Sequence, residues 1–167
     1  MRQVENPQNG SSSEGPVKRA VLKDLAHKVL NPSWVAFAWF GLTAGISLLE
    51  APVKFTAPLL TRPVALDVGR VVFQALNRVE LVLLVVVLVL VRVSRRSREL
   101  FAPCAGLALI LVLQSVWLLP ELARRAQAIA SGFEPEASIV HGAYGVLELA
   151  KLLLLLYVGF RAWTPRA

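Results

Sequence analysis

The sequence is poor in the residues that build disulfides, metal sites and redox centres. It holds a single cysteine, Cys104, a single methionine at its first position, and two histidines, His27 and His141. One cysteine cannot form an internal disulfide or a paired-thiolate metal site. The chain also has no glycine-rich phosphate loop, no Gly-x-Ser-x-Gly elbow and no histidine pair at metal-ligand spacing. We therefore expect neither an enzyme nor a resident cofactor or metal.

Charge is also scarce. Only 17% of the 167 residues are charged, whereas 56% are hydrophobic and the mean hydropathy is +0.59. A soluble domain needs charged residues spread along the chain to cover its surface, but here the charges are bunched at the ends of apolar segments. This composition predicts an integral membrane protein.

Four apolar windows are long enough to cross a bilayer. A hydrocarbon core of roughly 30 Å needs about 20 residues of helix. The windows cover residues 34–53, 71–91, 101–119 and 139–160. No strand pattern competes, and backbone groups in lipid must be satisfied within a helix or a closed barrel, so each window predicts a helix. With short connections between antiparallel neighbours, the predicted fold is all-α, an integral membrane four-helix bundle over residues 31–167.

Proline and other capping residues mark the expected helix ends. Asn31 is an N-cap candidate directly before a proline at the first helical position. Pro63 and Pro103 suit the first turns of the second and third helices, and Pro120 is expected to stop the third. Residues 121–138 are then expected to form a polar connection to the last span.

The amino-terminal segment is polar and then amphipathic. Residues 1–16 are rich in Ser, Gly, Asn and Pro, a composition typical of disordered chain. In residues 17–30 apolar side chains recur every four positions among lysines, which predicts a short basic amphipathic helix at the membrane interface. A solvated extension of the first span would show the same pattern. An anionic inner leaflet is the expected partner of Lys18, Arg19, Lys23, Lys28, Arg95 and Arg96.

The distribution of lysine and arginine predicts the orientation of the chain. Basic residues concentrate in the amino-terminal arm, in the loop after the second span and in the carboxy-terminal tail, and such residues favour the cytoplasmic side. Both termini are therefore expected in the cytoplasm, with the spans in a bacterial inner membrane. Nucleic acid is not an expected partner despite the net charge of +7, because no aromatic residues are interleaved among these cations. A homo-oligomer and a membrane partner are both left open.

Two of the predicted spans carry notable residues at the same spacing, with offsets of 0, 3, 7 and 10. The two sets are His141, Tyr144, Glu148 and Lys151 on the last span, and Arg70, Phe73, Asn77 and Glu80 on the second. At about 100° per residue each set keeps to one side of its helix. Turned inward, the sets predict a polar interior from the external mouth to mid-depth, to which Glu50 and Gln114 contribute. The cytoplasmic half is expected to be apolar.

The two charges near the middle of the last span need compensation. A charged residue at a helix centre costs about 2.5 to 3.5 kcal/mol on insertion, while each leucine returns roughly 0.3 to 0.6 kcal/mol. The leucines of this span therefore offset one charge but hardly two. Lys151 is expected to pair either with Glu148 on its own helix or with Glu80 across the bundle.

Ionisable residues within the membrane support two interpretations of function. Polar contacts between membrane helices stabilise packing by on the order of 1 kcal/mol each, yet ionisable groups inside spans are also functional candidates. The first hypothesis is a small permease or ion-handling bundle with Glu80, Glu148 and Lys151 along the path. The second is a non-transporting accessory protein whose buried polar residues only fix helix packing.

Two stretches also resemble a known family. They are APVKFTAPLLTRPVALDVGRVVFQALNRVE, residues 51–80, and the HGAYGVLELAKL opening of the last span, and they resemble the transmembrane protein 205-like family of four-helix membrane proteins. The similar features are Phe55 after the first span, Phe73 leading into the second, and the His-Gly pair at His141. The resemblance implies the four-helix architecture. A eukaryotic member is associated with tolerance to metal-containing drugs, but this chain lacks the thiol or thioether cluster that soft-metal export needs, so that activity is not expected here.

Overall fold

The computed structural model describes residues 18, 31–94, 96–133 and 138–164, and its regular secondary structure there is entirely helical. The expected disordered arm lies outside these residues. So do the expected amphipathic helix, apart from the exposed and helical Lys18, and the basic residues Arg19, Lys23, Lys28 and Arg95.

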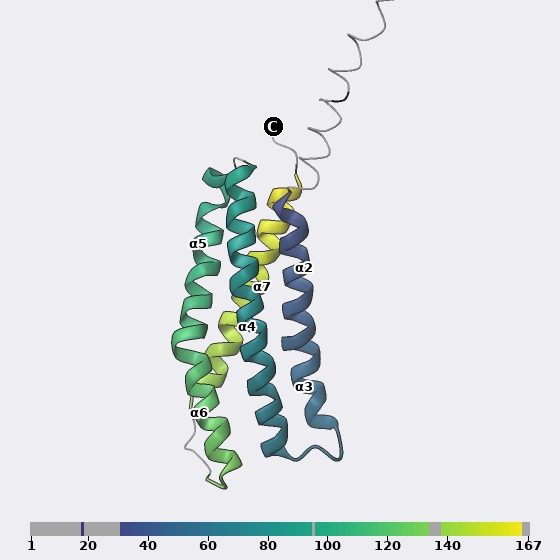
Figure 1. Cartoon of the computed structure of the whole chain (residues 1–167), viewed down its shortest axis with the longest axis vertical. Coiled ribbons are helices and arrows are strands. Elements are labelled where there is room, and N and C mark those ends of the chain that lie inside the picture. Colours follow the sequence, from purple (N-terminus) through teal and green to yellow (C-terminus); the bar gives the residue numbers. More distant parts are fainter. Residues whose placement is uncertain (1–17, 19–30, 95, 134–137, 165–167) are drawn as a thin grey trace, which may run out of the picture.

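The helices join into long rods (Figure 1). The first rod runs through α2 (Pro32–Ala44), a π-helical turn η1 (Gly45–Glu50), α3 (Ala51–Val53) and a 3-10 turn η2 (Lys54–Thr56). The next is the single helix α4 (Arg62–Val93). A third combines α5 (Ser97–Leu113), the π-helical turn η3 (Gln114–Leu118) and α6 (Leu119–Ala130), and α7 (Val140–Trp163) follows.

Three helical stretches are long and apolar enough to cross a membrane. They are Pro32–Thr56, Arg98–Ala130 and Val140–Trp163. α4, which contains the expected second span, is not among them. The described part of the chain is thus all-helical, with three candidate membrane-spanning helices.

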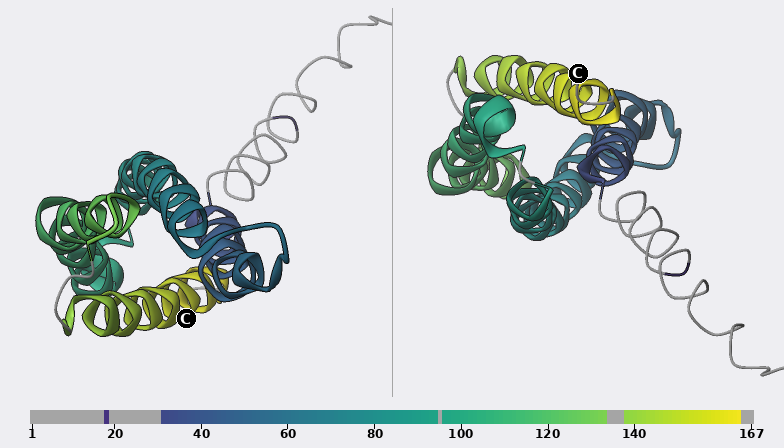
Figure 2. Two further views of the ribbon diagram at one scale, coloured as in Figure 1. Left: turned by 90° about the horizontal axis from the view of Figure 1, so that it is seen from below. Right: turned by 90° about the horizontal axis from the view of Figure 1, so that it is seen from above.

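The rods lie alongside one another, and the chain reverses direction between successive rods (Figure 1). The turn at residues 57–61, the end of α6 and the start of α7 lie at one end, here called the loop end. The start of α2, the turn between α4 and α5, and the end of α7 lie at the opposite terminal end. Seen along the rods, α4 and α7 occupy opposite sides and run parallel, with α2 and the α5–α6 rod between them (Figure 2).

Two of the predicted helix starts are confirmed. The Asn31 side chain accepts a hydrogen bond from the backbone N–H of Ser33 at 3.0 Å, with a proline following in the first turn. Pro63 likewise lies in the first turn of α4. In both places the ring replaces a backbone N–H that has no partner inside the helix.

The expectations for Pro103 and Pro120 are wrong. Pro103 lies inside α5, which begins at Ser97, because the polar residues before the apolar window are helical as well. Pro120 does not stop the third helix, since the chain stays helical to Ala130. The π-helical turn η3 ends just before α6, so that Pro120 falls in the first turn of a new α-helical segment, where its missing N–H is harmless.

The expected polar connection at 121–138 is therefore also wrong over its first part, which forms α6. This segment is amphipathic: Ala126 is buried, Leu122 packs against the buried Leu118 and Leu119, and Glu121 forms ion pairs along the outer surface. The apolar window predicted only the part of this rod that suits lipid. The helix continues beyond that window as an amphipathic segment, which apolarity alone does not reveal.

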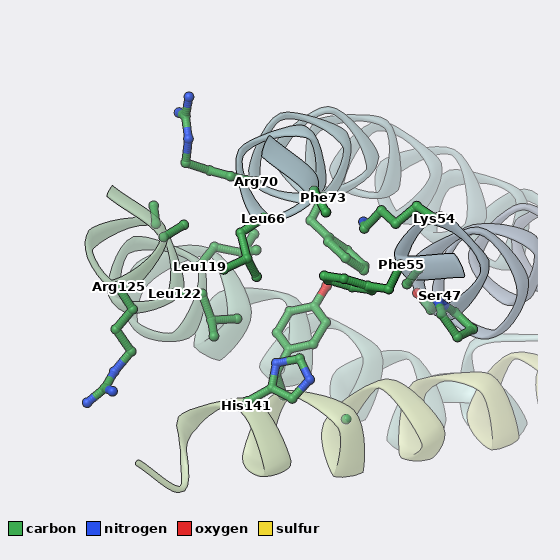
Figure 3. Close-up of a pocket in the computed structure, with 18 of the residues that line it drawn as sticks. Ser47, Lys54, Phe55, Leu66, Arg70, Phe73, Leu119, Leu122, Arg125 and His141 are labelled. Carbon is green, nitrogen blue, oxygen red and sulfur yellow. The ribbon is translucent and has the colours of Figure 1, made fainter. Parts of the chain in front are cut away.

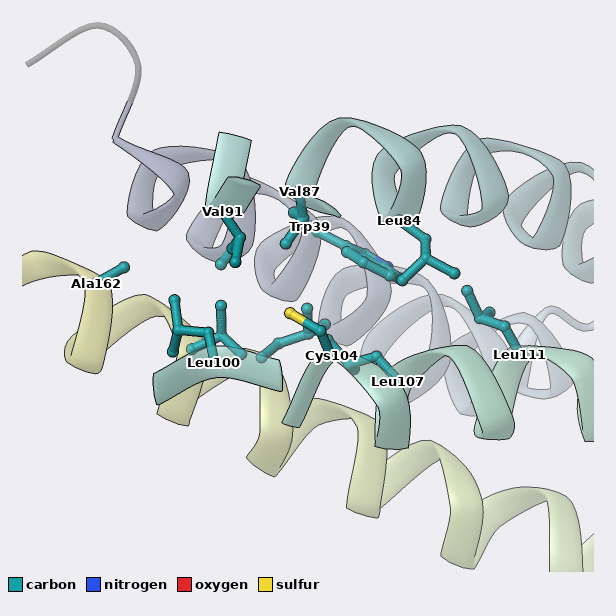
Figure 4. Packing of buried hydrophobic residues seen from close by; sticks show 12 residues of the cluster. Trp39, Leu84, Val87, Val91, Leu100, Cys104, Leu107, Leu111 and Ala162 are labelled. Atoms are coloured by element: carbon teal, nitrogen blue, oxygen red, sulfur yellow. The ribbon is translucent and has the colours of Figure 1, made fainter. Parts of the chain in front are cut away.

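A tightly packed apolar core fills the terminal-end half (Figure 4). It joins all the rods, and its buried members are Ala36, Trp39, Leu84, Val87, Val91, Leu100, Cys104, Leu107, Leu111, Leu155, Val158 and Ala162. We call this set the apolar core. Because this core fills the terminal-end half, the polar side chains of the spans lie in the middle of the rods and at the loop end.

Candidate functional site

A buried ion cluster lies in the middle of the rods, next to the apolar core. The Lys151 Nζ atom lies 2.7 and 2.8 Å from the two carboxylate oxygens of Glu80 and 2.9 Å from Glu148 Oε2. It also donates a hydrogen bond of 3.1 Å to the side-chain oxygen of Gln114. Lys151 and Gln114 are fully buried, and Glu80 and Glu148 are 1% and 3% exposed. Lys151 thus contacts both carboxylates that the sequence offered as alternative partners.

Each carboxylate of this ion cluster is also held by neutral donors. Glu80 Oε1 accepts from the Trp39 indole at 3.0 Å and from the Thr43 hydroxyl at 2.8 Å. Glu148 accepts from the Ser47 hydroxyl at 2.5 Å and from the Gln114 amide at 2.7 Å. Ionised carboxylates only accept hydrogen bonds, and several donors around each one compensate its removal from water.

Sequence reasoning missed the three donors from the first rod. Trp39, Thr43 and Ser47 are spaced four residues apart, which places them on one face of a helix. Each of these residues stands alone among apolar neighbours in the sequence, so no single one of them indicated a polar site. The regular spacing of hydrogen-bonding side chains was the available signal.

The two π-helical turns supply residues to the ion cluster. Ser47 lies in η1 and Gln114 in η3, and each turn is followed by a proline near the start of the next segment, at Pro52 and Pro120. A π-helical turn holds one extra residue and is found frequently at functional sites. Here the two turns bring a hydroxyl and an amide to the same carboxylate, Glu148.

The matching spacing on α4 and α7 has a geometric result. Glu80 contacts Lys151, and seven residues earlier on each helix the Phe73 and Tyr144 rings meet edge to face at 5.5 Å. Because α4 and α7 run in the same direction, residues at equal distances from Glu80 and from Lys151 along their helices lie opposite each other. Tyr144 is buried and also interacts with Glu148.

The other expected site residues lie apart from the ion cluster. Asn77 is buried one turn from Glu80 and accepts a hydrogen bond from Ser115 at 2.9 Å. Arg70 pairs with Asp67 on its own helix at 2.8 Å and points away from the interior (Figure 3). Glu50 lies 3.4 Å from Lys54 on the first rod. His141 is exposed near the start of α7. Of the expected set, the structure brings together Glu80, Gln114, Glu148, Lys151 and, at their edge, Tyr144.

A cavity of about 930 Å³ occupies the loop-end half (Figure 3). Its walls are mainly apolar and aromatic, with Phe55, Leu66, Phe73, Leu119 and Leu122 among them. Polar groups line it at two depths. Lys54 and His141 lie nearer the loop end, while Ser47 and Glu148 bring it to the ion cluster. The cavity volume lies within the range of small-molecule sites.

The ion cluster thus faces the cavity on its loop-end side and the apolar core on its terminal-end side. No residue of the apolar core lines the cavity. Two carboxylates surround one ammonium, so the ionised cluster has one excess negative charge, and Glu148 is its charged member at the cavity wall. Within the described part of the chain, no group of three or more His, Cys, Asp or Glu side chains is placed to hold a metal ion. The arrangement can accept a solute from the loop end and expose it to Glu148.

No family model, curated protein or solved structure matches this chain. The resemblance to the transmembrane protein 205-like family therefore stays a prediction that rests on the short motifs at residues 51–80 and at His141.

Proposed function

We propose that this protein is a four-span membrane protein that admits a small solute or ion from the loop end and handles it at the ion cluster. α4 supplies the fourth span. It packs against α2, α5 and α6, and from Leu81 to Val91 it is uninterruptedly apolar. The buried charge at Glu80, next to this run, is compensated by Lys151.

The basic residues support one orientation of this bundle. Those near the spans concentrate in the segments at the terminal end, which favours a cytoplasmic location for both termini. The cavity then opens to the external side. The apolar core closes the cytoplasmic side, so complete passage requires a second conformation.

The observation that carries the proposal is the contact between cavity and ion cluster at Glu148. A cluster that only fixed packing would not need to meet a cavity of about 930 Å³. Instead, one carboxylate with two charged or polar partners, Lys151 and Gln114, forms part of the cavity wall. Ionisable residues within membrane helices that face a cavity are candidates for a solute or ion pathway.

Osmotic swelling of proteoliposomes tests the proposal. Vesicles with purified protein are mixed with hyperosmotic glycerol, or with potassium chloride or potassium benzoate plus valinomycin, and reswelling is followed by light scattering. We expect reswelling with at least one of these solutes to exceed the rate in empty vesicles several-fold. Glu148→Gln is expected to abolish the excess rate, because it removes the charged group at the cavity wall.

Glu148→Gln is a suitable variant because it leaves Lys151 and Glu80 as a neutral pair, so that the fold should persist. The matched control is Glu121→Gln, which removes a carboxylate at the same end that does not line the cavity. Control vesicles should swell like wild type. Rates equal to empty vesicles for all three solutes would contradict the proposal.

The accessory role is the second candidate, favoured by one observation. The ion cluster connects all the rods, through Trp39 and Thr43 on α2, Glu80 on α4, Gln114 on η3 and Lys151 on α7. Such a cluster fixes the register of the helices even if nothing passes it. In that case Glu148→Gln should change stability while swelling stays at the level of empty vesicles in wild type and variant alike.

A further inference from the structure

Lys54 is a cation whose side chain points into the cavity. It lies in η2 at the end of the first rod, and Figure 3 shows its side chain directed toward Phe73, whereas the Arg70 and Arg125 side chains point outward. The Nζ atom lies 5.5 Å from the centre of the Phe73 ring and 5.8 Å from that of Phe55. The side chain is only 9% exposed. An ammonium group is thus nearly buried against aromatic rings at the cavity wall.

Among the described residues this ammonium group donates one hydrogen bond, to Glu50 Oε2, and that bond is long at 3.4 Å. The group has three donors, and charge-assisted bonds to carboxylates measure about 2.7 to 2.9 Å. In the described part of the chain its acidic partner is Glu50, whose carboxylate lies 3.4 Å away and is 35% exposed. Lys151, by comparison, makes contacts of 2.7 to 3.1 Å with three side chains. Burial without close acceptors is costly, so a bound anion would stabilise Lys54.

Gly69 makes room for the Lys54 head group. It is buried in α4, and a Cβ atom there would lie 2.8 Å from Lys54 Nζ and 3.4 Å from Cε. Glycine inside a helix costs about 0.5 to 1 kcal/mol relative to alanine. Any larger residue would displace the ammonium group from its present position, so this glycine maintains a specific location for the charge.

We propose that the cavity binds an amphipathic monoanion, a small apolar or aromatic molecule with one carboxylate, whose anionic group pairs with Lys54. This inference rests on the proposed function and names its substrate class. Lys54 points into the cavity, and its one ammonium group accommodates a single anionic group; Arg62 also lines the cavity. The apolar body of the ligand contacts Phe55, Phe73 and Leu122. Glu148 at the inner end disfavours a second negative charge there.

The test uses three probes of nearly identical shape: benzoate, neutral benzamide and cationic benzamidine. Binding to the full chain in phosphatidylcholine nanodiscs is measured by calorimetry. We expect benzoate to bind about tenfold more tightly than benzamide, and benzamidine to bind no more tightly than benzamide. Equal affinities for benzoate and benzamide would overturn the inference.

Three variants locate the effect. Lys54→Met should reduce the benzoate preference to less than about twofold while keeping the apolar stem, and Gly69→Ala should weaken it to an intermediate value by displacing Nζ. Arg124→Met, which removes an exposed cation outside the cavity, should leave the preference unchanged. A preference retained in Lys54→Met, or lost equally in Arg124→Met, would overturn the assignment. Unfolding midpoints near wild type verify that each variant is folded.

An anionic group can reach the cavity on a dissolved molecule or as the phosphate of a lipid headgroup, and a second nanodisc composition separates these sources. Unchanged benzoate affinity in discs containing phosphatidylglycerol supports a dissolved ligand, whereas loss of benzoate binding there overturns it in favour of an anionic lipid. The outcome is independent of the swelling assay. Benzoate binding without solute entry contradicts transport alone, and glycerol or chloride entry without benzoate preference contradicts the Lys54 site alone.

Discussion

The two halves of the molecule are made from the same rods but packed differently. At the terminal end, side chains from every rod meet in the apolar core, and none of its members lines the loop-end cavity. At the loop end the same rods enclose a cavity of about 930 Å³. The ion cluster lies between the halves. One half can thus supply rigidity while the other keeps an unfilled volume, in which we place the proposed ligand.

Hydrogen bonds at the outer end of the terminal-end half stabilise it further. Arg96, in the turn between α4 and α5, donates to the backbone carbonyl oxygens of Arg161 at 2.8 Å and Thr164 at 2.9 Å. Arg161 in turn pairs with Glu99 at 3.2 Å. Arg96 thus binds the end of α7, where free carbonyl groups attract cations. Its contact with anionic lipid stays a prediction.

The largest effect is expected at the boundary between the halves. Lys151→Met leaves Glu80 and Glu148 buried without their shared cation, which should lower the free energy of unfolding by about 3 to 5 kcal/mol. The double variant with Glu80→Gln should recover much of this loss. Unfolding in mixed micelles followed by circular dichroism measures both. Losses that simply add would show that the two residues do not act as a pair.

Matched truncations compare packing in the two halves directly. Leu155→Ala, in the fully buried apolar core, should destabilise by about 2 to 3 kcal/mol because it opens a void. Leu66→Ala only enlarges an existing cavity and should cost less than about 1 kcal/mol. Both are measured in the same unfolding assay. Equal losses would mean that the loop-end half is as tightly packed as the other.

Glycine substitutions give a smaller version of the same comparison. A Cβ atom at Gly159, in the terminal-end half, would lie 2.5 Å from the Phe37 ring, which itself contacts Phe160. Gly159→Ala should therefore destabilise by about 1 to 2 kcal/mol. Gly145, beside the cavity, has nothing within 4 Å of such an atom. Gly145→Ala should leave the unfolding midpoint unchanged or slightly raised, and a loss matching that of Gly159→Ala would refute the contrast.

The last prediction assigns a side of the membrane to each half. Cys104 belongs to the apolar core, so its resistance to an impermeant reagent is expected for either orientation and cannot report topology. In a Cys104→Ser background, Leu59→Cys, 97% exposed at the loop end, should react with an impermeant maleimide on intact cells. Thr164→Cys should react only after permeabilisation. The reverse pattern would place the cavity mouth in the cytoplasm.

The spacing of polar residues predicted part of the site because helices repeat regularly. Offsets on α4 and α7 placed Glu80 and Lys151 on inward faces, and the two contact each other. Arg70 and His141 share those faces, but they lie near helix starts. There Arg70 pairs with Asp67 three residues away and His141 is exposed. The periodicity of a helix predicts which face a side chain lies on. The position of the side chain along the helix decides whether it is buried and needs a partner from another helix.

Helix continuity was harder to predict for a different reason. Proline usually ends a helix, and the sequence does not show that a π-helical turn precedes Pro120. Local widening depends on packing against neighbouring rods, which a single segment does not reveal.

The wide turn at Gly45–Glu50 sets the angular position of everything that follows it on the first rod. Winding that turn as an ordinary α-helix, with its number of residues unchanged, would rotate residues 51–56 by about 100° relative to Trp39 and Thr43. Lys54 would then leave the cavity wall while the rod kept nearly the same length. The alignment of the loop-end charge with the buried pair thus depends on the wide winding of this one turn, and losing that winding would break the alignment without altering any side chain.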